Sequence, residues 1–373
     1  MIRLLIVDDS ALMRRQLSML FAAAGGFDVR QARNGLEAVE ANREFQPDVV
    51  TLDINMPEMD GITALSLIMA ERPVPVVMVS SLTEKGALAT FEALNLGAVE
   101  YVAKPGGTIS LSLDQIKDDL LAKVRAAAKA RLRKDSSRPR VPVRTDGNAL
   151  RSEAGGLRER MRQERDTIQR EASQATQMRR GEAGVLLIGV STGGPRALEE
   201  VLPALPADFP WPVLVAQHMP ASFTGPFAAR LNALCPLEVL EVTRPMPLRP
   251  GQVYVGKGGA DLVVSRRGDE LLALPRPESA THLWHPSVEL MGRTALEHVP
   301  ARQLIGVMLT GMGYDGADAF AEIRKQGGRT IAESEETAVV FGMPAELIER
   351  GGASLVLPLE NVAQQVRAWV ARS

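Results

Sequence analysis

The feature that most constrains the fold is a repeated alternation of short apolar runs with longer stretches of helical periodicity. This alternation is typical of βαβ units, so it predicts an α/β fold with doubly wound parallel sheets. The strands predicted in the first part are Leu4–Val7, Asp48–Asp53, Val76–Ser80 and Val99–Lys104. After Gly184 the alternation returns, with main predicted strands Val185–Val190, Val213–Gln217 and Arg302–Leu309.

Between these two parts the pattern stops. Residues 135–183 carry many charges and few large apolar side chains, and a last helix of the first part is expected from about Leu113 to Arg133. A chain of 373 residues is long enough for two domains. We therefore expect an N-terminal domain at 1–125, a charged linker at 126–183 and a second, parallel-sheet domain at 184–373.

Composition excludes several classes of protein. The formal charge is only −2, from 43 basic and 45 acidic residues, so we expect no binding of nucleic acid. No apolar run approaches the length of a membrane span or of a signal peptide, so we expect no membrane insertion. The single cysteine, Cys235, allows no disulfide within the chain, and together these features predict a cytoplasmic location.

Polar side chains stand where the strands of the first part end. Asp8 and Asp9, Asp53, Ser80 and Lys104 each follow or close a predicted strand. Ligands of open α/β sheets bind at the carboxyl ends of the strands. Clustered carboxylates suit a hard cation such as Mg²⁺, and a carboxylate can also attack phosphorus to give an aspartyl-phosphate.

These residues resemble those of a response-regulator receiver domain. The motifs that carry the resemblance are Asp8-Asp9, LDINMPEMDG at Leu52–Gly61, VSS at Val79–Ser81 and YVAKP at Tyr101–Pro105. The resemblance implies a flavodoxin-like fold and phosphorylation of Asp53 by a chemotaxis histidine kinase. It also implies that Asp8, Asp9 and Asp53, with the backbone carbonyl of Asn55, hold Mg²⁺.

The same resemblance assigns a conformational switch. Ser80 would contact the phosphoryl oxygens and Lys104 would pair with the phosphoryl group. Tyr101 would be the aromatic residue that changes rotamer.

In the second part, Gly189-Val190-Ser191-Thr192-Gly193 fits the pattern G-x-S-x-G between a strand and a helix. This is the context of a nucleophile elbow, in which a sharp turn exposes the serine hydroxyl. The alternative is a glycine-rich turn that binds phosphate. The segment has neither the G-x-G-x-x-G nor the Walker A pattern, which favours the nucleophile.

A serine nucleophile needs a base and an acid that orients the base. Of the four histidines, His218 ends a predicted strand, so it is the expected base. Asp315 lies in a glycine-rich loop after another strand, so it is the expected orienting acid. His282 and His285 have the spacing of metal ligands on a helix, but two histidines without a third ligand are weak evidence for a metal.

This second part resembles the catalytic domain of the chemotaxis protein-glutamate methylesterases, the CheB family. The motifs are STGGP at Ser191–Pro195, QHMP at Gln217–Pro220 and TGMGYDG at Thr310–Gly316. The resemblance implies catalysis by Ser191, His218 and Asp315 without a cofactor in this domain. It also places the backbone N–H of Met312 in the oxyanion hole and Thr192 beside the nucleophile.

The family resemblance implies hydrolysis of glutamate methyl esters, and deamidation of glutamines, on chemoreceptors. A non-catalytic response regulator and a general serine esterase are the alternatives. One departure concerns the segment that usually reads PSVD after basic residues: here His285 precedes PSV and Glu289 replaces the aspartate. Finally, a receiver beside a hydrolase predicts that the unphosphorylated receiver covers the active site.

Overall fold

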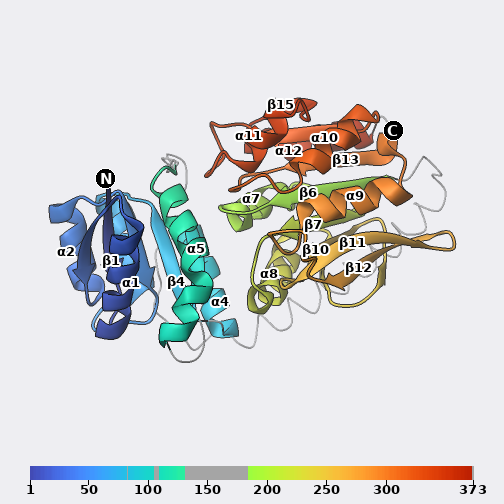
Figure 1. Ribbon diagram of the computed structural model, residues 1–373. Helices are drawn as coiled ribbons and strands as arrows, with labels where there is room; N and C mark the ends of the chain where they lie inside the picture. The colour runs from blue at the N-terminus through green and yellow to red at the C-terminus, as the bar shows by residue number, and fades with distance from the viewer. Residues whose placement is uncertain (82, 105–108, 131–183, 372–373) are drawn as a thin grey trace, which may run out of the picture.

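The computed structural model describes residues 1–81, 83–104, 109–130 and 184–371 (Figure 1). We call residues 1–130 the N-terminal unit and residues 184–371 the C-terminal unit. Most of the predicted linker lies outside the described residues.

The N-terminal unit is a parallel sheet with helices on both faces. Its strands are ordered β2-β1-β3-β4-β5. Helices α1 and α5 cover one face, while α2, α3 and α4 cover the other. The elements are β1 (Ile2–Val7), α1 (Ala11–Ala24), β2 (Phe27–Ala32), α2 (Gly35–Phe45), β3 (Val49–Asp53), α3 (Gly61–Glu71), β4 (Val76–Ser81), α4 (Glu84–Leu96), β5 (Glu100–Lys104) and α5 (Ile109–Ala127).

The sequence missed strand β2 for a physical reason. Strand β3 is buried throughout, so it reads as a continuous apolar run. Strand β2 lies at the edge of the sheet and alternates between more and less exposed side chains, with polar residues among them. The last helix also differs from expectation, because α5 ends at Ala127 and not near Arg133.

The C-terminal unit contains a larger parallel sheet in the order β15-β14-β13-β6-β7-β10-β8. Helices α7, α8 and α12 pack on one face and α9, α10 and α11 on the other. This confirms the expected α/β class. The elements of this sheet are β6 (Val185–Val190), α7 (Gly194–Val201), β7 (Val213–Gln217), α8 (Ala221–Leu234), β8 (Glu238–Val242), β10 (Gln252–Gly256), α9 (Val288–His298), β13 (Leu304–Met308), α10 (Ala317–Lys325), β14 (Arg329–Glu333), α11 (Met343–Glu349), β15 (Leu355–Leu357) and α12 (Leu359–Val370).

A small antiparallel sheet accompanies the parallel sheet of the C-terminal unit. It is formed by β9 (Met246–Pro247), β11 (Ala260–Arg267) and β12 (Glu270–Pro277). Helix α9 contacts β11, so this sheet extends the layer that α9 belongs to. The start of β11 supplies a buried carboxylate, Asp261, which the site below depends on.

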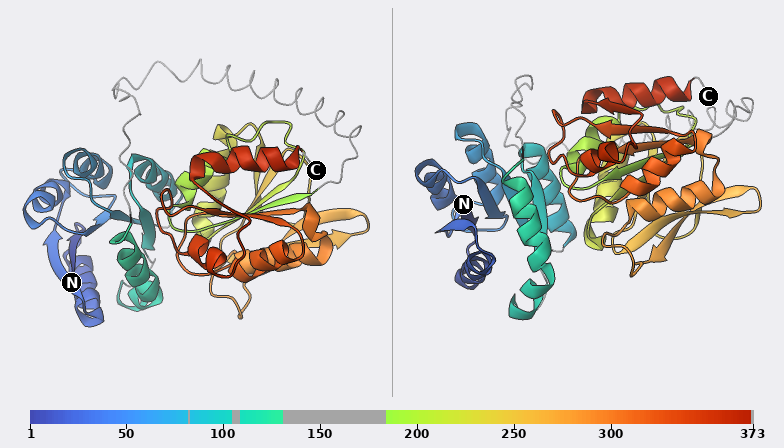
Figure 2. Two further views of the ribbon diagram at one scale, coloured as in Figure 1. Left: turned by 90° about the horizontal axis from the view of Figure 1, so that it is seen from above. Right: turned by 45° about the horizontal axis from the view of Figure 1, so that its top comes forward.

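The two units share a continuous apolar contact. Helix α4 packs against α7 and α8 (Figures 1 and 2). The Phe91 ring of α4 lies 5.4 Å from that of Phe227 and 6.2 Å from that of Phe223, both in α8. Tyr101 of β5 stacks on Phe223 at 4.8 Å with an interplanar angle of 17°. The core of the N-terminal unit thus continues into that of the C-terminal unit through these four rings.

A prediction concerns the turn between β6 and α7. Gly193 has φ of +78°, and a Cβ there would lie 2.7 Å from Cβ of Val339. Gly193→Ala should therefore lose more than the about 1–2 kcal/mol that a left-handed backbone costs an L-residue. Gly268→Ala is the control, because Gly268 has φ of +61° and nothing within 4 Å of its added Cβ.

The measurement is urea unfolding followed by tryptophan fluorescence. Trp211, Trp284 and Trp369 all lie in the C-terminal unit, so the signal reports that unit. An equal loss of unfolding free energy in the two variants would contradict the crowding argument.

Candidate active site and phosphoacceptor cluster

The predicted catalytic residues of the C-terminal unit meet at one edge of its sheet. Ser191 follows β6, His218 follows β7 and Asp315 lies in the loop after β13. In the sheet β6 lies between β7 and β13, so the strand order changes direction there. Such a switch point is where ligands bind in open α/β sheets.

Backbone contacts hold the strand ends together. The N–H of Ser191 donates to the carbonyl of Thr310 at 3.0 Å, and that of His218 donates to the carbonyl of Val190 at 3.2 Å. The buried Gln217 donates its Nε2 to the carbonyls of both Ser191 and His218, each at 3.0 Å. Gln217 belongs to the QHMP motif, but its bridging role was not evident from the sequence.

His218 and Asp315 form a hydrogen bond. Nε2 of His218 lies 2.8 Å from Oδ2 of Asp315, and both side chains are nearly buried. Burial by itself would raise the pKa of Asp315, but the hydrogen bond and charge of His218, with the N–H groups of Glu289 and Val288, hold that pKa below its usual range. Nδ1 of His218 is buried and has no hydrogen-bond partner among the described residues, so the Ser191 hydroxyl is not bonded to it in this structure.

Asp315 is also held by the beginning of α9. Its Oδ1 accepts from Oγ of Ser287 and from the N–H of Glu289, both at 3.0 Å, while its Oδ2 accepts from the N–H of Val288 at 2.6 Å. The first N–H groups of a helix have no partner within the helix, and the helix dipole is positive at this end. Helix α9 therefore stabilises the ionised carboxylate in the orientation that receives His218.

Glu289 and His285, the two residues that depart from the family pattern PSVD after basic residues, both have buried partners in the structure. Oε2 of Glu289 accepts from the N–H of Ala319 in α10 at 2.8 Å, and Oε1 pairs with Arg293 at 2.6 Å. Nδ1 of His285 lies 2.8 Å from Oδ1 of the buried Asp261. His282 and His285 lie in the loop before α9, not on a helix, so their expected helical spacing as metal ligands is wrong.

Trp284 lies on the predicted base, His218. Its ring stacks on that of His218 with centroids 5.7 Å apart and an angle of 4°. Trp211, by contrast, is 4% exposed and lies in the core. No signal in the sequence separated the two tryptophans, because the stacking depends on the loop before α9.

The predicted oxyanion residues also lie at this edge. Met312 follows Gly311, at which an added Cβ would lie 2.8 Å from Cβ of Ser191. Thr192 is buried, and its carbonyl accepts from Oγ1 of Thr310 at 2.9 Å. The loop after β13 therefore runs directly alongside the Ser191 turn.

The predicted phosphoacceptor residues meet at the carboxyl edge of the other sheet. One ligand oxygen each from Asp8, Asp9 and Asp53 lies within 4.8 Å of the others. Lys104 Nζ lies 3.0 Å from Oδ2 of Asp8 and 2.8 Å from Oδ2 of Asp53. Burial raises the pKa of Asp53, and Lys104 only partly offsets this. Burial by itself would lower the pKa of Lys104, but the carboxylates of Asp53 and Asp8 outweigh it and raise that pKa.

The remaining predicted switch residues have different surroundings. Ser80 is buried, and its Oγ donates to the carbonyl of Gly86 at 3.2 Å. Asn55 is exposed after β3. Tyr101 is 3% exposed between the units, and burial raises the pKa of its phenol well above the usual range. Its oxygen has no hydrogen-bond partner in the described part of the chain.

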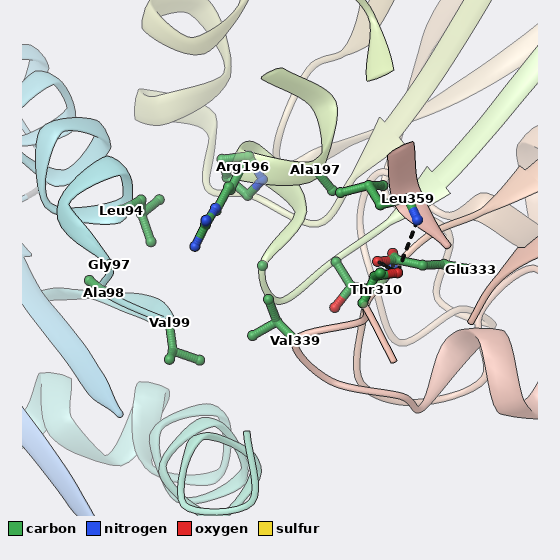
Figure 3. Close-up of a pocket in the computed structure, with 13 residues that line it drawn as sticks. Leu94, Gly97, Ala98, Val99, Arg196, Ala197, Thr310, Glu333, Val339 and Leu359 are labelled. Carbon is green, nitrogen blue, oxygen red and sulfur yellow. Dashed lines mark hydrogen bonds between the residues drawn. The ribbon is translucent and has the colours of Figure 1, made fainter. Parts of the chain in front are cut away.

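A pocket and a cleft lie between the N-terminal unit and the loops that carry the predicted catalytic residues. A small pocket of about 40 Å³ lies between Leu94 and Gly97 on one side and Gly193, Arg196 and further residues on the other (Figure 3). A cleft of about 490 Å³ lies between α5 and the 335–342 segment, and Met312 lines it. The N-terminal unit therefore reaches the turn after Ser191 and the loop after β13.

Within the residues described, no helix is both long and apolar enough to cross a membrane.

Comparison with known proteins gives the family. A family model described as CheB methylesterase matches residues 186–366, and one described as response regulator receiver domain matches residues 4–113. Protein-glutamate methylesterase/protein-glutamine glutaminase 3 of Rhodospirillum rubrum is 53% identical over 100% of this chain and 97% of its own length.

A second relative is the protein-glutamate methylesterase/protein-glutamine glutaminase 2 of Rhodopseudomonas palustris, 51% identical over 99% of this chain and 98% of its own length. The crystal structure of the Thermotoga maritima CheB methylesterase catalytic domain is 35% identical, covers 52% of this chain and 100% of its own, and has a TM-score of 0.49. With relatives this similar over the whole chain, the protein belongs to the CheB methylesterase family and carries a response-regulator receiver domain before the methylesterase domain.

Proposed function

We propose that the chain hydrolyses methyl esters of glutamate side chains on chemoreceptors, and deamidates glutamines there, through Ser191, His218 and Asp315. The observation that carries this proposal is the hydrogen bond of 2.8 Å between His218 and Asp315 beside the Ser191 turn. The names of the relatives, which are methylesterases and glutaminases, support the substrate class.

In this proposal the two nitrogens of His218 have different roles. Nε2 is engaged by Asp315, so Nδ1 is the nitrogen that takes the proton of Ser191. The serine oxygen attacks the ester carbonyl, and Nδ1 returns the proton to the leaving methanol. Water then attacks the acyl-enzyme with the same nitrogen as base, which releases glutamate and restores Ser191.

The negative oxygen of the tetrahedral intermediate needs fixed donors. Helix α7 begins at Gly194, directly after the Ser191 turn, so the positive end of its dipole lies next to the nucleophile. The N–H of Met312 is the proposed hydrogen-bond donor, because its loop packs against Ser191 through Gly311. No cofactor enters this step.

In the receiver, we propose phosphorylation of Asp53 by a chemotaxis histidine kinase. Asp8 and Asp9, with Asp53 and the carbonyl of Asn55, fit a hard divalent cation, because one carboxylate oxygen of each of the three acids lies within 4.8 Å of the others. Mg²⁺ held there would neutralise the charge of the arriving phosphoryl group. Lys104 is poised between Asp8 and Asp53 to pair with that group.

The domain contact supports inhibition by the unphosphorylated receiver. Tyr101 lies on the same strand as Lys104, three residues before it, and stacks on Phe223 of the catalytic domain. The receiver also lies opposite the turn after Ser191, on the other side of the small pocket of Figure 3. Phosphorylation at Asp53 draws Lys104 and Ser80 toward the new charge, which alters the strand that carries Tyr101.

The triad prediction uses single substitutions. Ser191→Ala and His218→Ala should each lower kcat for methanol release from methylated receptor membranes by about 10⁴- to 10⁶-fold, because the members act as a unit. Asp315→Asn should retain more activity, since the base and the oxyanion donors remain. Circular dichroism checks that the variants fold. Near-normal turnover in folded Ser191→Ala protein would refute the assignment.

The Glu289 prediction tests whether the unusual acid contacts substrate. Glu289→Gln keeps an acceptor for the N–H of Ala319, and burial already raises the pKa of this carboxyl. We expect kcat/KM within about twofold of the unmodified chain and an unfolding free energy within about 1 kcal/mol. Glu289→Ala should lose about 1–2 kcal/mol by removing that acceptor. A tenfold loss of kcat/KM in stable Glu289→Gln protein would instead indicate contact with substrate.

The regulatory prediction compares three proteins: the full chain, residues 184–373 alone and full-length Asp53→Ala. In a methanol-release assay, residues 184–373 should be more active than the unphosphorylated full chain, because the receiver contact is gone. A small phosphodonor with Mg²⁺ should activate the full chain but not Asp53→Ala. Equal basal rates for the fragment and the full chain would overturn inhibition by the receiver.

A further inference from the structure

Trp284 covers one face of the proposed catalytic base. Its ring is nearly parallel to that of His218, with an angle of 4° and centroids 5.7 Å apart. The Tyr314 ring meets Trp284 edge-on at 5.1 Å and 86°. His218 is therefore held at one edge by Asp315 and on one face by an indole.

The indole has little freedom to leave this place. A Cβ at Gly313 would lie 2.7 Å from Cζ2 of Trp284, so the ring packs directly on the backbone of the loop after β13. Gly313 has φ of +89°, which favours glycine, and only a residue without a side chain leaves room for the ring. The loop that carries Asp315 thus also supports Trp284.

The segment before α9 that carries Trp284 is fastened by a buried carboxylate. Asp261 is 1% exposed at the start of β11. Its Oδ2 accepts from the N–H of Ser279 at 2.9 Å, and its Oδ1 accepts from the N–H of Ser287 at 3.0 Å and contacts Nδ1 of His285 at 2.8 Å. These contacts anchor both ends of the 279–287 segment to Asp261. The position of Trp284 within this segment is therefore fixed by hydrogen bonds to the core of the unit.

We propose that Trp284 is a positioning residue of the hydrolase: its indole fixes the plane of the His218 ring with Nδ1 toward the Ser191 hydroxyl, and it supports the positive charge that forms when Nδ1 takes the serine proton. The inference rests on the proposed triad. A single hydrogen bond at Nε2 leaves the imidazole free to swing about that bond, whereas a parallel ring against its face removes this motion.

The electrostatic contribution favours the transition state over the resting state. An aromatic face attracts a cation, and indole does so best among the side chains. The neutral imidazole of the resting enzyme gains little from this, but the imidazolium formed during acylation gains the full attraction. Loss of the aromatic face should therefore lower kcat by about tenfold and change KM little.

The test uses the full chain treated with phosphodonor and Mg²⁺, and compares Trp284→Leu, Trp284→Phe and Leu283→Ala. Leucine keeps apolar bulk on Gly313 without an aromatic face, while phenylalanine restores a face. Leu283 precedes Trp284 and is 74% exposed, so Leu283→Ala is the matched control on the same segment. Circular dichroism and thermal melting establish that each variant is folded.

Two rates are measured for each protein. The first is kcat and KM for methanol release from methylated receptor membranes. The second is the labelling of Ser191 by diisopropyl fluorophosphate, followed by mass spectrometry. In that reaction the serine oxygen bonds to phosphorus, fluoride leaves and His218 takes the serine proton. The small probe makes no receptor contacts, so its rate reports activation of the nucleophile alone.

We expect Trp284→Leu to lower both kcat and the labelling rate by about tenfold, Trp284→Phe to stay within about threefold and Leu283→Ala to match the unmodified chain. Labelling of Trp284→Leu at the normal rate with a raised KM would overturn the proposal, because Trp284 would then be a receptor contact. If the unmodified chain is not labelled at Ser191, the triad itself is wrong, and this inference falls with it. Normal Ser191 labelling in the unmodified chain keeps the two failures distinguishable.

Discussion

The C-terminal unit is organised around the buried carboxylate of Asp315. A buried charge is costly unless it is paired and hydrogen-bonded, and Asp315 meets this need with donors from His218, Ser287 and the first N–H groups of α9. The same contacts join the loop after β13, the end of β7 and helix α9. The requirement to satisfy one carboxylate thereby fixes the position of the imidazole on which the proposed chemistry depends.

A second buried carboxylate extends this arrangement outward. Asp261 closes the segment before α9 through Ser279, His285 and Ser287. Ser287 also donates to Asp315, so the two acids are bridged by one residue. Because both acids bind the segment around Ser287, one connected set of hydrogen bonds holds His218 and the segment that carries Trp284.

The sequence predicted what depends on strand ends and missed what depends on edges and loops. Ser191, His218 and Asp315 stand at neighbouring strand ends because parallel strands bring their carboxyl ends to one edge. Their catalytic roles remain predictions. Strand β2 was not predicted, because this edge strand shows no continuous apolar run. Neither Trp284 nor His285 could be placed, since their partners His218 and Asp261 are distant in sequence and meet only in the folded chain.

The contact between the units has two properties that suit control by a single phosphoryl group. Its centre is aromatic, because Phe91 and Tyr101 of the N-terminal unit pack against Phe223 and Phe227 of the C-terminal unit. Yet Tyr101 lies on β5, whose last residue, Lys104, is held by Asp53 and Asp8. A complete reversal of a two-state equilibrium requires about 5.5 kcal/mol of differential free energy. A new anion at Asp53 acts on the Lys104 end of the strand, while the stacking acts on the Tyr101 end. In the proposed switch, a new charge at Asp53 changes the contacts of Lys104 at one end of β5, and this movement competes with the stacking of Tyr101 on Phe223 near the other end.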